Sequence, residues 1–109
     1  MLLVIKKRAT KEETEKMGED LMGFIKVVVD VERGILAGGG QRHVEGEQKL
    51  LERGSKQQNL WGGGFDTETK EIDYNSMINL RPSQDNPSRD ILSSEIRKAF
   101  DKIVQDLLS

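Results

Sequence analysis

Apolar residues recur at every second position in residues 25–31, which is the spacing of a strand with one buried face. The pattern resumes at residues 35–37 after Glu32-Arg33-Gly34, so the two runs are predicted to form a tight hairpin. A shorter apolar run at residues 2–6 predicts another strand. The first third of the chain is therefore expected to contribute strands to a sheet.

Three other segments show the spacing of amphipathic helices. Thr10-Lys11-Glu12-Glu13 matches a capping box, in which a threonine and a glutamate side chain each accept a backbone N–H, and it predicts a helix over residues 11–22. A second helix is predicted at residues 42–53. Its inward residues are expected to be Val44, Leu50 and Leu51. The last helix has the clearest apolar stripe, formed by Leu92, Ile96, Ala99, Phe100, Ile103 and Leu107.

Two further strands are predicted at residues 60–65 and 71–80. One face of the second is expected to carry Ile72, Tyr74, Ser76, Ile78 and Leu80. Residues 81–87 are rich in turn formers and predict an ordered loop. The order strand-helix-strand-strand-helix-strand-strand-helix predicts an α+β fold, a two-layer domain with three helices on a mixed or antiparallel sheet of about five strands. We expect residues 1–109 to form this single domain.

The charge balance and the lack of cysteine limit which partners and which cellular compartment we expect. The chain has 17 basic and 19 acidic residues that alternate along most of its length, so no nucleic-acid partner is expected. The absence of cysteine excludes disulfides and cysteine nucleophiles and fits a reducing compartment. The short apolar run before Lys6-Lys7-Arg8 is the reverse of a signal peptide, and no stretch reaches the length of a membrane span. We therefore expect a cytoplasmic protein without a membrane partner.

The stretch AGGGQRHVEGEQ, residues 37–48, places three glycines and the only histidine between a predicted strand and a predicted helix. Glycine-rich loops before helices bind phosphates, but this stretch matches neither the P-loop nor the dinucleotide-binding pattern. Glu45 and Glu47 lie in the first turns of the helix and would repel a phosphate. We interpret the glycines as structural, because they let a strand pass close to a helix or to a neighbouring chain.

His43 and Glu47 are four residues apart and so share one face of the predicted helix. They could form an acid/base pair or contribute two metal ligands. A single histidine argues against zinc, and we expect no metal or cofactor. The non-catalytic alternative is a surface or interface histidine that is hydrogen-bonded to a glutamate. Ser55 and Ser76 are available as nucleophiles, but neither lies in a nucleophile-elbow motif.

Four more residues are candidates for ligand binding: Trp61, Asn79, Arg81 and Asn86. The tryptophan is surrounded by amides and glycines, and it belongs either to the core or to a flat platform for a ligand or partner. The other three lie at the end of a predicted strand and in the loop that follows. They either anchor that loop by bonding its carbonyls or form a clamp for a carboxylate or phosphate.

Four motifs extend over much of the chain: His43-x-Glu45-x-Glu47-x-x-Leu50-Leu51, Gly54-Ser55-x-Gln57, Leu60-Trp61-Gly62 and Ile78-Asn79-Leu80-Arg81-Pro82. Together they resemble a family of small single-domain prokaryotic proteins of unknown function. The similarity covers nearly the whole chain from about Ile25 onward. The resemblance implies a fold unit with a cluster of polar positions, and no reaction.

Two functions of different classes fit these observations. The first is a small homo-oligomeric module for binding or assembly, and we favour it because no complete set of catalytic residues is present. The second is a hydrolase-like or transferase-like enzyme that uses His43 with Glu45 or Glu47, and Arg81 as an anion clamp. We expect His43, Glu47, Asn79 and Arg81 to lie near one another, because sites gather at the ends of elements.

Overall fold

The computed structural model describes residues 1–109 and contains a five-stranded antiparallel sheet and three α-helices. The strands are β1 (Leu3–Ile5), β2 (Phe24–Asp30), β3 (Ile35–Gly38), β4 (Leu60–Asp66) and β5 (Ile72–Asp73), in the spatial order β1-β3-β2-β4-β5. The helices are α1 (Lys11–Gly18), α2 (His43–Glu52) and α3 (Ser94–Leu108). The α+β class and the order of strands and helices are confirmed.

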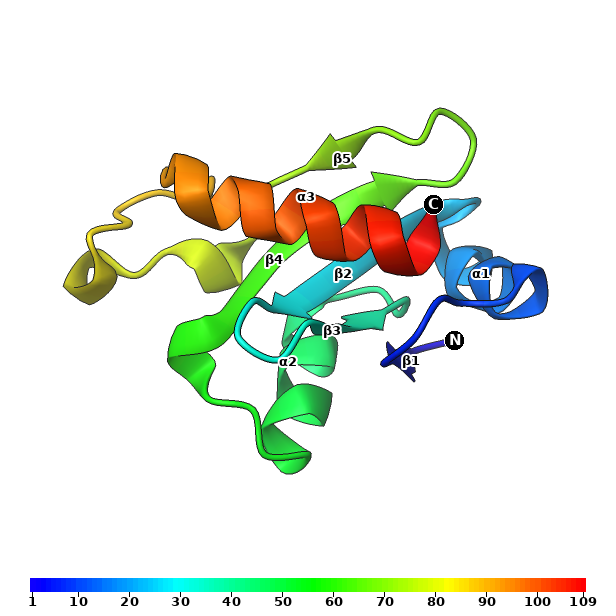
Figure 1. Cartoon of the computed structure of the whole chain (residues 1–109), viewed down its shortest axis with the longest axis horizontal. Helices are drawn as coiled ribbons and strands as arrows, with labels where there is room; N and C mark the ends of the chain where they lie inside the picture. The colour runs from blue at the N-terminus through cyan, green and yellow to red at the C-terminus, as the bar shows by residue number, and fades with distance from the viewer.

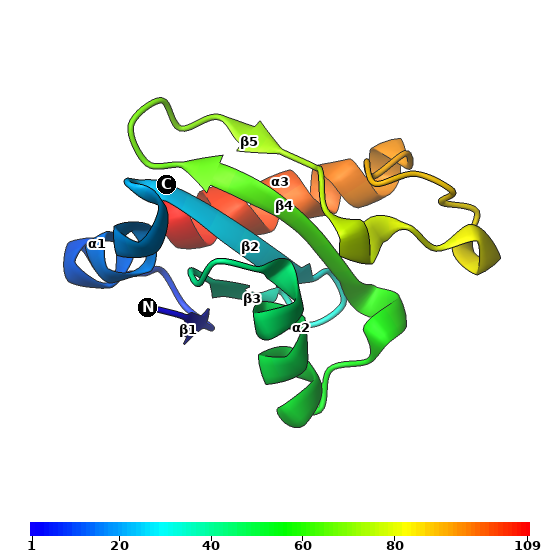
Figure 2. The same cartoon turned by 180° about the vertical axis from the view of Figure 1, so that it is seen from behind.

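The side chains of β2 contribute to two apolar clusters on opposite faces of the sheet. Val27 and Val29 pack in one cluster with Phe100 of α3, whereas Val28 packs in the other with Leu50 of α2. Figures 1 and 2 show α3 across one face and α2 on the other. Helices therefore cover both faces, one layer more than the two predicted, because β2 and β3 carry apolar residues at consecutive positions and not only at alternate ones.

The two faces are covered unequally. The helix α2 packs on β2 and β3, and Figure 2 shows no α-helix over β4 and β5 on that side, where only the short 3-10 turn Met77–Asn79 contacts β4. On the opposite face, α3 runs across the sheet along most of its own length. The part of the sheet beside α2 is therefore less covered by α-helices than the rest of the sheet.

The start of α1 follows the predicted capping box, and the start of α3 has a cap that was not predicted. Thr10 Oγ1 accepts the N–H of Glu13 at 3.1 Å, and the Glu13 carboxylate accepts the N–H of Thr10 at 2.9 Å. The helix α1 ends at Gly18 and continues as a single 3-10 turn, Glu19–Leu21. At the start of α3, Ser93 Oγ accepts the N–H of Ile96 at 3.2 Å. None of the helices has the length and apolar character needed to cross a membrane.

The long strand predicted at residues 71–80 is wrong. Only Ile72–Asp73 pairs with β4, and the 3-10 turn η3 (Met77–Asn79) follows. Ser76 starts this turn because its Oγ accepts the N–H of Ile78 at 3.2 Å. The apolar residues that were expected to share a face are consequently separated: Tyr74 packs with the α3 cluster and Ile78 with the α2 cluster.

Two apolar side chains predicted to face the core are exposed. Val44 is 54% exposed, and the inward positions of α2 are Gly46 and Leu50. Leu92 is also 54% exposed, because α3 begins two residues after it. Four other residues of the predicted stripe, Ile96, Phe100, Ile103 and Leu107, pack in the cluster under α3, and Phe100 is fully buried.

Candidate functional site

A cavity of about 560 Å³ lies beside the start of α2. Its lining comes from β2, the first residues of α2, the middle of β4, and the segment from β5 to η3, with Arg89 added from the following loop. Gly63 and Ser76 are buried in the floor, while Arg42, Val44 and Met77 are exposed around it. The size falls within the range of about 300–1,000 Å³ that is usual for small-molecule sites.

The glycines of β4 allow neighbouring segments to lie directly on the strand. A methyl group on Gly62 would come within 2.6 Å of Cβ of Ser76, and one on Gly64 would overlap the ring of Phe24. Phe24 and Ser76 both line the cavity. The Gly62-Gly63-Gly64 tract therefore sets the depth of the floor by letting these side chains pack against the backbone.

His43, the first residue of α2, is fixed by a hydrogen bond of 2.7 Å from Nε2 to the carbonyl oxygen of Gly63. Since a carbonyl can only accept, Nε2 carries the hydrogen. Burial lowers the pKa of His43 below its usual 6.5, and the charge of Lys26 lowers it further; the bond to Gly63 and the charge of Asp73 act in the opposite direction. The neutral form of the ring therefore predominates at pH 7.

The second ring nitrogen of His43, Nδ1, has no partner in the protein. The only buried polar side-chain atom without a hydrogen bond is Nε of Arg81, so Nδ1 remains accessible to solvent. With the proton held on Nε2, Nδ1 is a hydrogen-bond acceptor. His43 thus presents a fixed acceptor beside the cavity.

The lining has more positive than negative groups. Lys26, Arg42 and Arg89 contribute three cations, and none of their side chains forms an ion pair in the protein. Asp73 is the one acidic residue of the lining, and its Oδ1 accepts the N–H of Asn75 at 3.2 Å. The positive excess is local, because the whole chain has a net charge of −2.

The two glutamates expected to assist His43 have other partners. Glu45 Oε1 accepts the backbone N–H groups of Gln41 at 3.1 Å and Arg42 at 3.0 Å, which stabilises the start of α2. Glu47 Oε2 lies 3.5 Å from Nε2 of Gln57. Neither carboxylate is hydrogen-bonded to His43, and the acidic residue that influences its pKa is Asp73.

The serines do not form a catalytic pair with His43. Ser76 lines the cavity, but its Oγ is the acceptor that starts η3. Ser55 lies elsewhere and donates from Oγ to Asp30 at 2.6 Å. No group of three or more histidine, aspartate or glutamate side chains is arranged to hold a metal ion.

Asn79 is fully buried and completes the hydrogen bonding of β4 where β5 has already ended. Its Oδ1 accepts the N–H of Gly62 at 2.8 Å, and its Nδ2 donates to the carbonyl of Gly62 at 2.9 Å. The same Nδ2 also lies 3.0 Å from the carbonyl of Tyr74 and 2.9 Å from that of Arg89. One carboxamide therefore takes the place of a strand residue and holds the two segments that border the cavity.

Asn86 anchors the following loop in the same manner. Its Nδ2 donates to the carbonyls of Asn79 at 2.7 Å and Asp90 at 2.9 Å, and its Oδ1 accepts the N–H of Leu92 at 3.0 Å. The amide groups of Asn79 and Asn86 are thus used within the protein. Neither residue lines the cavity.

Arg81 and Trp61 pack together outside the cavity. The guanidinium carbon lies 4.1 Å from the centre of the indole ring, and the side chain donates to the carbonyls of Gln57 and Leu60. Burial lowers the pKa of Arg81, while the charge of Glu47 opposes that shift. Trp61 is 2% exposed and belongs to the core cluster.

Of the four polar residues expected to converge, two meet at β4. His43 binds Gly63 and Asn79 binds Gly62, but only His43 lines the cavity. The charge of Glu47 acts on the pKa of Arg81, and Arg81 anchors a loop away from the cavity.

The glycines of residues 38–40 have the structural role that the sequence indicates. A methyl group on Gly38 would come within 2.7 Å of the sulfur of Met17 in α1, and one on Gly39 would overlap the carbonyl of Met1. Gly39 and Gly40 also have φ angles of 103° and 76°, which favour glycine. The turn therefore passes close to α1 and to the chain before β1.

Sequence reasoning missed Phe24, Lys26, Asp73 and Arg89 as cavity residues. Phe24 and Lys26 lie two apart in β2, so their alternation with the buried residues Ile25 and Val27 could have placed them on one face. Nothing in the sequence marks Arg89, because its position depends on the carbonyl bonds made by Asn79 and by Ser76 N–H.

Comparison with known proteins identifies the family of the chain. No curated protein and no solved structure matches it. The family model that matches covers residues 3–107 and is described as a protein of unknown function (DUF5674). The resemblance drawn from the four sequence motifs is confirmed and extends further toward the start of the chain than expected. The chain therefore belongs to this family of proteins of unknown function.

Proposed function

We propose that the protein is a binding module that holds a small ligand in the cavity beside α2. The observation that carries this proposal is His43, whose ring is fixed by Gly63 while Nδ1 stays without a protein partner beside a cavity of about 560 Å³. A fixed acceptor in a preformed concavity is the arrangement by which binding sites orient a ligand.

Binding is favoured over catalysis because the groups around His43 do not form a reacting set. A general base must reach a nucleophile or a substrate proton, and a nucleophilic serine must be hydrogen-bonded to its base. Ser76 Oγ is engaged by Ile78 N–H, and both Glu45 and Arg81 are engaged outside the cavity. For the enzyme alternative, the cavity therefore supplies the imidazole of His43 without a nucleophile or carboxylate that acts with it.

A fragment screen followed by two-dimensional 1H–15N NMR tests the proposal. We expect fragments to shift the amide signals of Gly63 and His43 in a saturable manner. In the variant Val44→Trp, a larger side chain at the exposed rim of the cavity should abolish these shifts. The matched control is Met22→Trp, at an exposed position that does not line the cavity.

Two results would contradict the proposal. One is a screen in which no fragment of any charge shifts these signals. The other is binding that persists unchanged in Val44→Trp, which would place the ligand elsewhere.

A further inference from the structure

We infer that the ligand of this cavity is a small organic anion, with a carboxylate or phosphate group beside Lys26, Arg42 and Arg89 and an apolar body against Phe24 and its neighbours. This inference rests on the proposed function and specifies its ligand class. It combines three features of the lining: unpaired cations, an apolar wall and a free acceptor.

The cations come from three separate parts of the chain. Lys26 lies in β2, Arg42 precedes α2, and Arg89 follows the loop anchored by Asn86. Lys26 is half-buried, so its charge is less well screened than that of a fully exposed lysine. Because a single carboxylate, Asp73, opposes three cations, a ligand anion would find unused positive charge.

The apolar wall is made by four side chains of the lining: Phe24, Val44, Met77 and Ile78. Val44 is 54% exposed and Met77 59% exposed, so both present apolar surface to solvent at the rim. The ring of Phe24 is held against the backbone of Gly64. A ligand with a flat or apolar body would cover this surface and remove it from water.

Nδ1 of His43 supplies the third element of recognition. As an acceptor it suits a ligand with a hydroxyl or N–H group, and it cannot donate to the anionic group while the ring is neutral. The anionic end is therefore expected near the lysine and arginine side chains. A cationic ligand would find only one carboxylate in the lining, that of Asp73.

Five probes separate the contributions of charge and apolar body. Phenyl phosphate and benzoate carry a ring and an anion; benzyl alcohol and benzylamine carry the same ring with neutral and positive groups; inorganic phosphate lacks the ring. We expect the two aromatic anions to shift the amide signals of Phe24, His43 and Gly63 and to bind at least about tenfold more tightly than the other three probes, because each loses one class of contact. A difference between phenyl phosphate and benzoate identifies the preferred anionic group.

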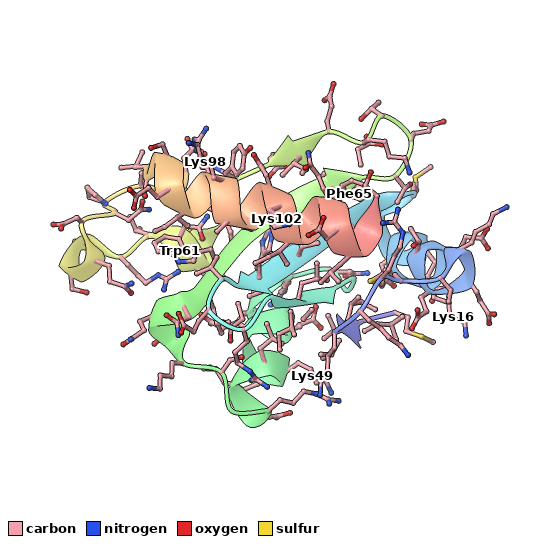
Figure 3. The ribbon with its side chains drawn as sticks, in the orientation of Figure 1. Lys16, Lys49, Trp61, Phe65, Lys98 and Lys102 are labelled. Carbon is pink, nitrogen blue, oxygen red and sulfur yellow. The ribbon has the colours of Figure 1, made fainter.

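Charge variants of the full chain test the assigned residues. Lys26→Gln and Arg89→Gln should each weaken the binding of the aromatic anions by about tenfold, the effect of losing a contact to a charged group. Lys98→Gln is the matched control, because Lys98 is an exposed lysine of α3, on the opposite face of the sheet (Figure 3), and should leave binding unchanged. Unchanged NMR spectra away from the cavity establish that each variant is folded.

The results distinguish the failure of this inference from the failure of the proposed function. If benzyl alcohol or benzylamine binds the cavity as tightly as the anions, the ligand class is wrong and the binding module remains. Equal weakening by Lys98→Gln also overturns the inference, because it indicates non-specific attraction of anions. If no probe shifts the cavity signals and the fragment screen is also negative, both are wrong.

Discussion

Asn79 shows how much one side chain can hold when a strand ends early. Its carboxamide bonds both backbone groups of Gly62 and the carbonyls of Tyr74 and Arg89. We expect Asn79→Ala to lower the free energy of unfolding by about 2–4 kcal/mol, because it leaves several buried polar groups without partners. Urea unfolding measures the change. In the control Asn75→Ala, where the exposed amide bonds only Asp90, the loss should stay below about 0.5 kcal/mol.

Equal effects of the two asparagine variants would contradict this account of Asn79. They would mean that the hydrogen bonds to Gly62 are replaced by water at little cost. The exposed Asn75 is a suitable comparison because it belongs to the same segment between β5 and η3.

His43 makes the stability of the protein depend on pH. Burial lowers its pKa in the folded state below 6.5, so the unfolded chain takes up the proton first as the pH falls. The stabilisation is fully present above pH 6.5 and is lost as the pH falls toward the folded-state pKa. Because His43 is the only histidine, the slope between neutral pH and about pH 5.5 belongs to it and cannot exceed about 1.4 kcal/mol per pH unit.

Urea unfolding of the wild type and of His43→Gln over this range of pH provides the measurement. The variant should show a nearly flat profile, because glutamine does not titrate. A slope that persists in the variant would assign the pH dependence to other groups.

At the residue scale, the sequence singled out three polar residues and left two roles open for them. Asn79, Arg81 and Asn86 were predicted either to anchor the loop or to form a clamp, and the contacts observed in the protein are those of anchors. The choice depends on which carbonyls lie within reach of each side chain. That information belongs to the tertiary structure, and no sequence pattern contains it.

At the scale of elements, β4 needs its glycines because neighbouring groups pack where their side chains would lie. A methyl group on Gly63 would overlap the carbonyl of Asp73 and lie 2.6 Å from the ring of Phe100. We expect Gly63→Ala to lower the free energy of unfolding by about 2–3 kcal/mol, since the backbone of β5 cannot move without breaking its pairing. Thermal and urea unfolding give the magnitude.

The control for this substitution is Gly34→Ala, in the hairpin between β2 and β3. Gly34 has open space around it and a φ of 69°, so alanine there adds only backbone strain of about 1 kcal/mol. If Gly34→Ala is the more destabilising of the two, packing on β4 is not the reason for its glycines.

The elements that sequence patterns predicted well are those with a local cause. The capping box fixes the start of α1, and the apolar stripe of α3 needs no partner to be recognised. The predicted strand at residues 71–80 failed because its alternation is produced by contacts with two different clusters. A period of two in the sequence does not distinguish a strand from a segment that crosses the edge of a sheet.

At the scale of the molecule, several large apolar side chains remain in solvent, namely Met22, Val44, Met77, Leu80 and Leu92. We propose that part of this surface is covered in a homo-oligomer. Light scattering is expected to give a mass that rises above the monomer value of 12.3 kDa as concentration increases.

The double variant Leu80→Ser with Leu92→Ser should return the protein to a monomer. Met22→Ser is the control, because the chain near residue 22 lies at the opposite end of the molecule from the loop near residue 80 (Figure 1). A mass of 12.3 kDa at every concentration of the wild type would contradict the proposal.

The cavity could not be predicted from the sequence, because its lining combines separate segments around β4. His43 was predicted as a candidate from its rarity and its place near glycines. The partners assigned to it, Glu45 and Glu47, were chosen by their proximity in sequence. The residues that lie beside it in space, Lys26 and Asp73, come from strands.

Because the sheet is covered unequally, neighbouring residues of one strand can have different roles: some pack against α3, and others line the cavity. In β2, Val27 and Val29 pack with α3 and determine stability, while Lys26 points to the cavity side and is free of that role. In the proposed binding site, we therefore expect substitutions at Lys26, Val44, Met77 and Arg89 to alter ligand preference without disturbing the core. Within the family, we expect these positions to diverge between members while Val27, Val29 and Phe100 remain apolar, so that one scaffold serves different ligands.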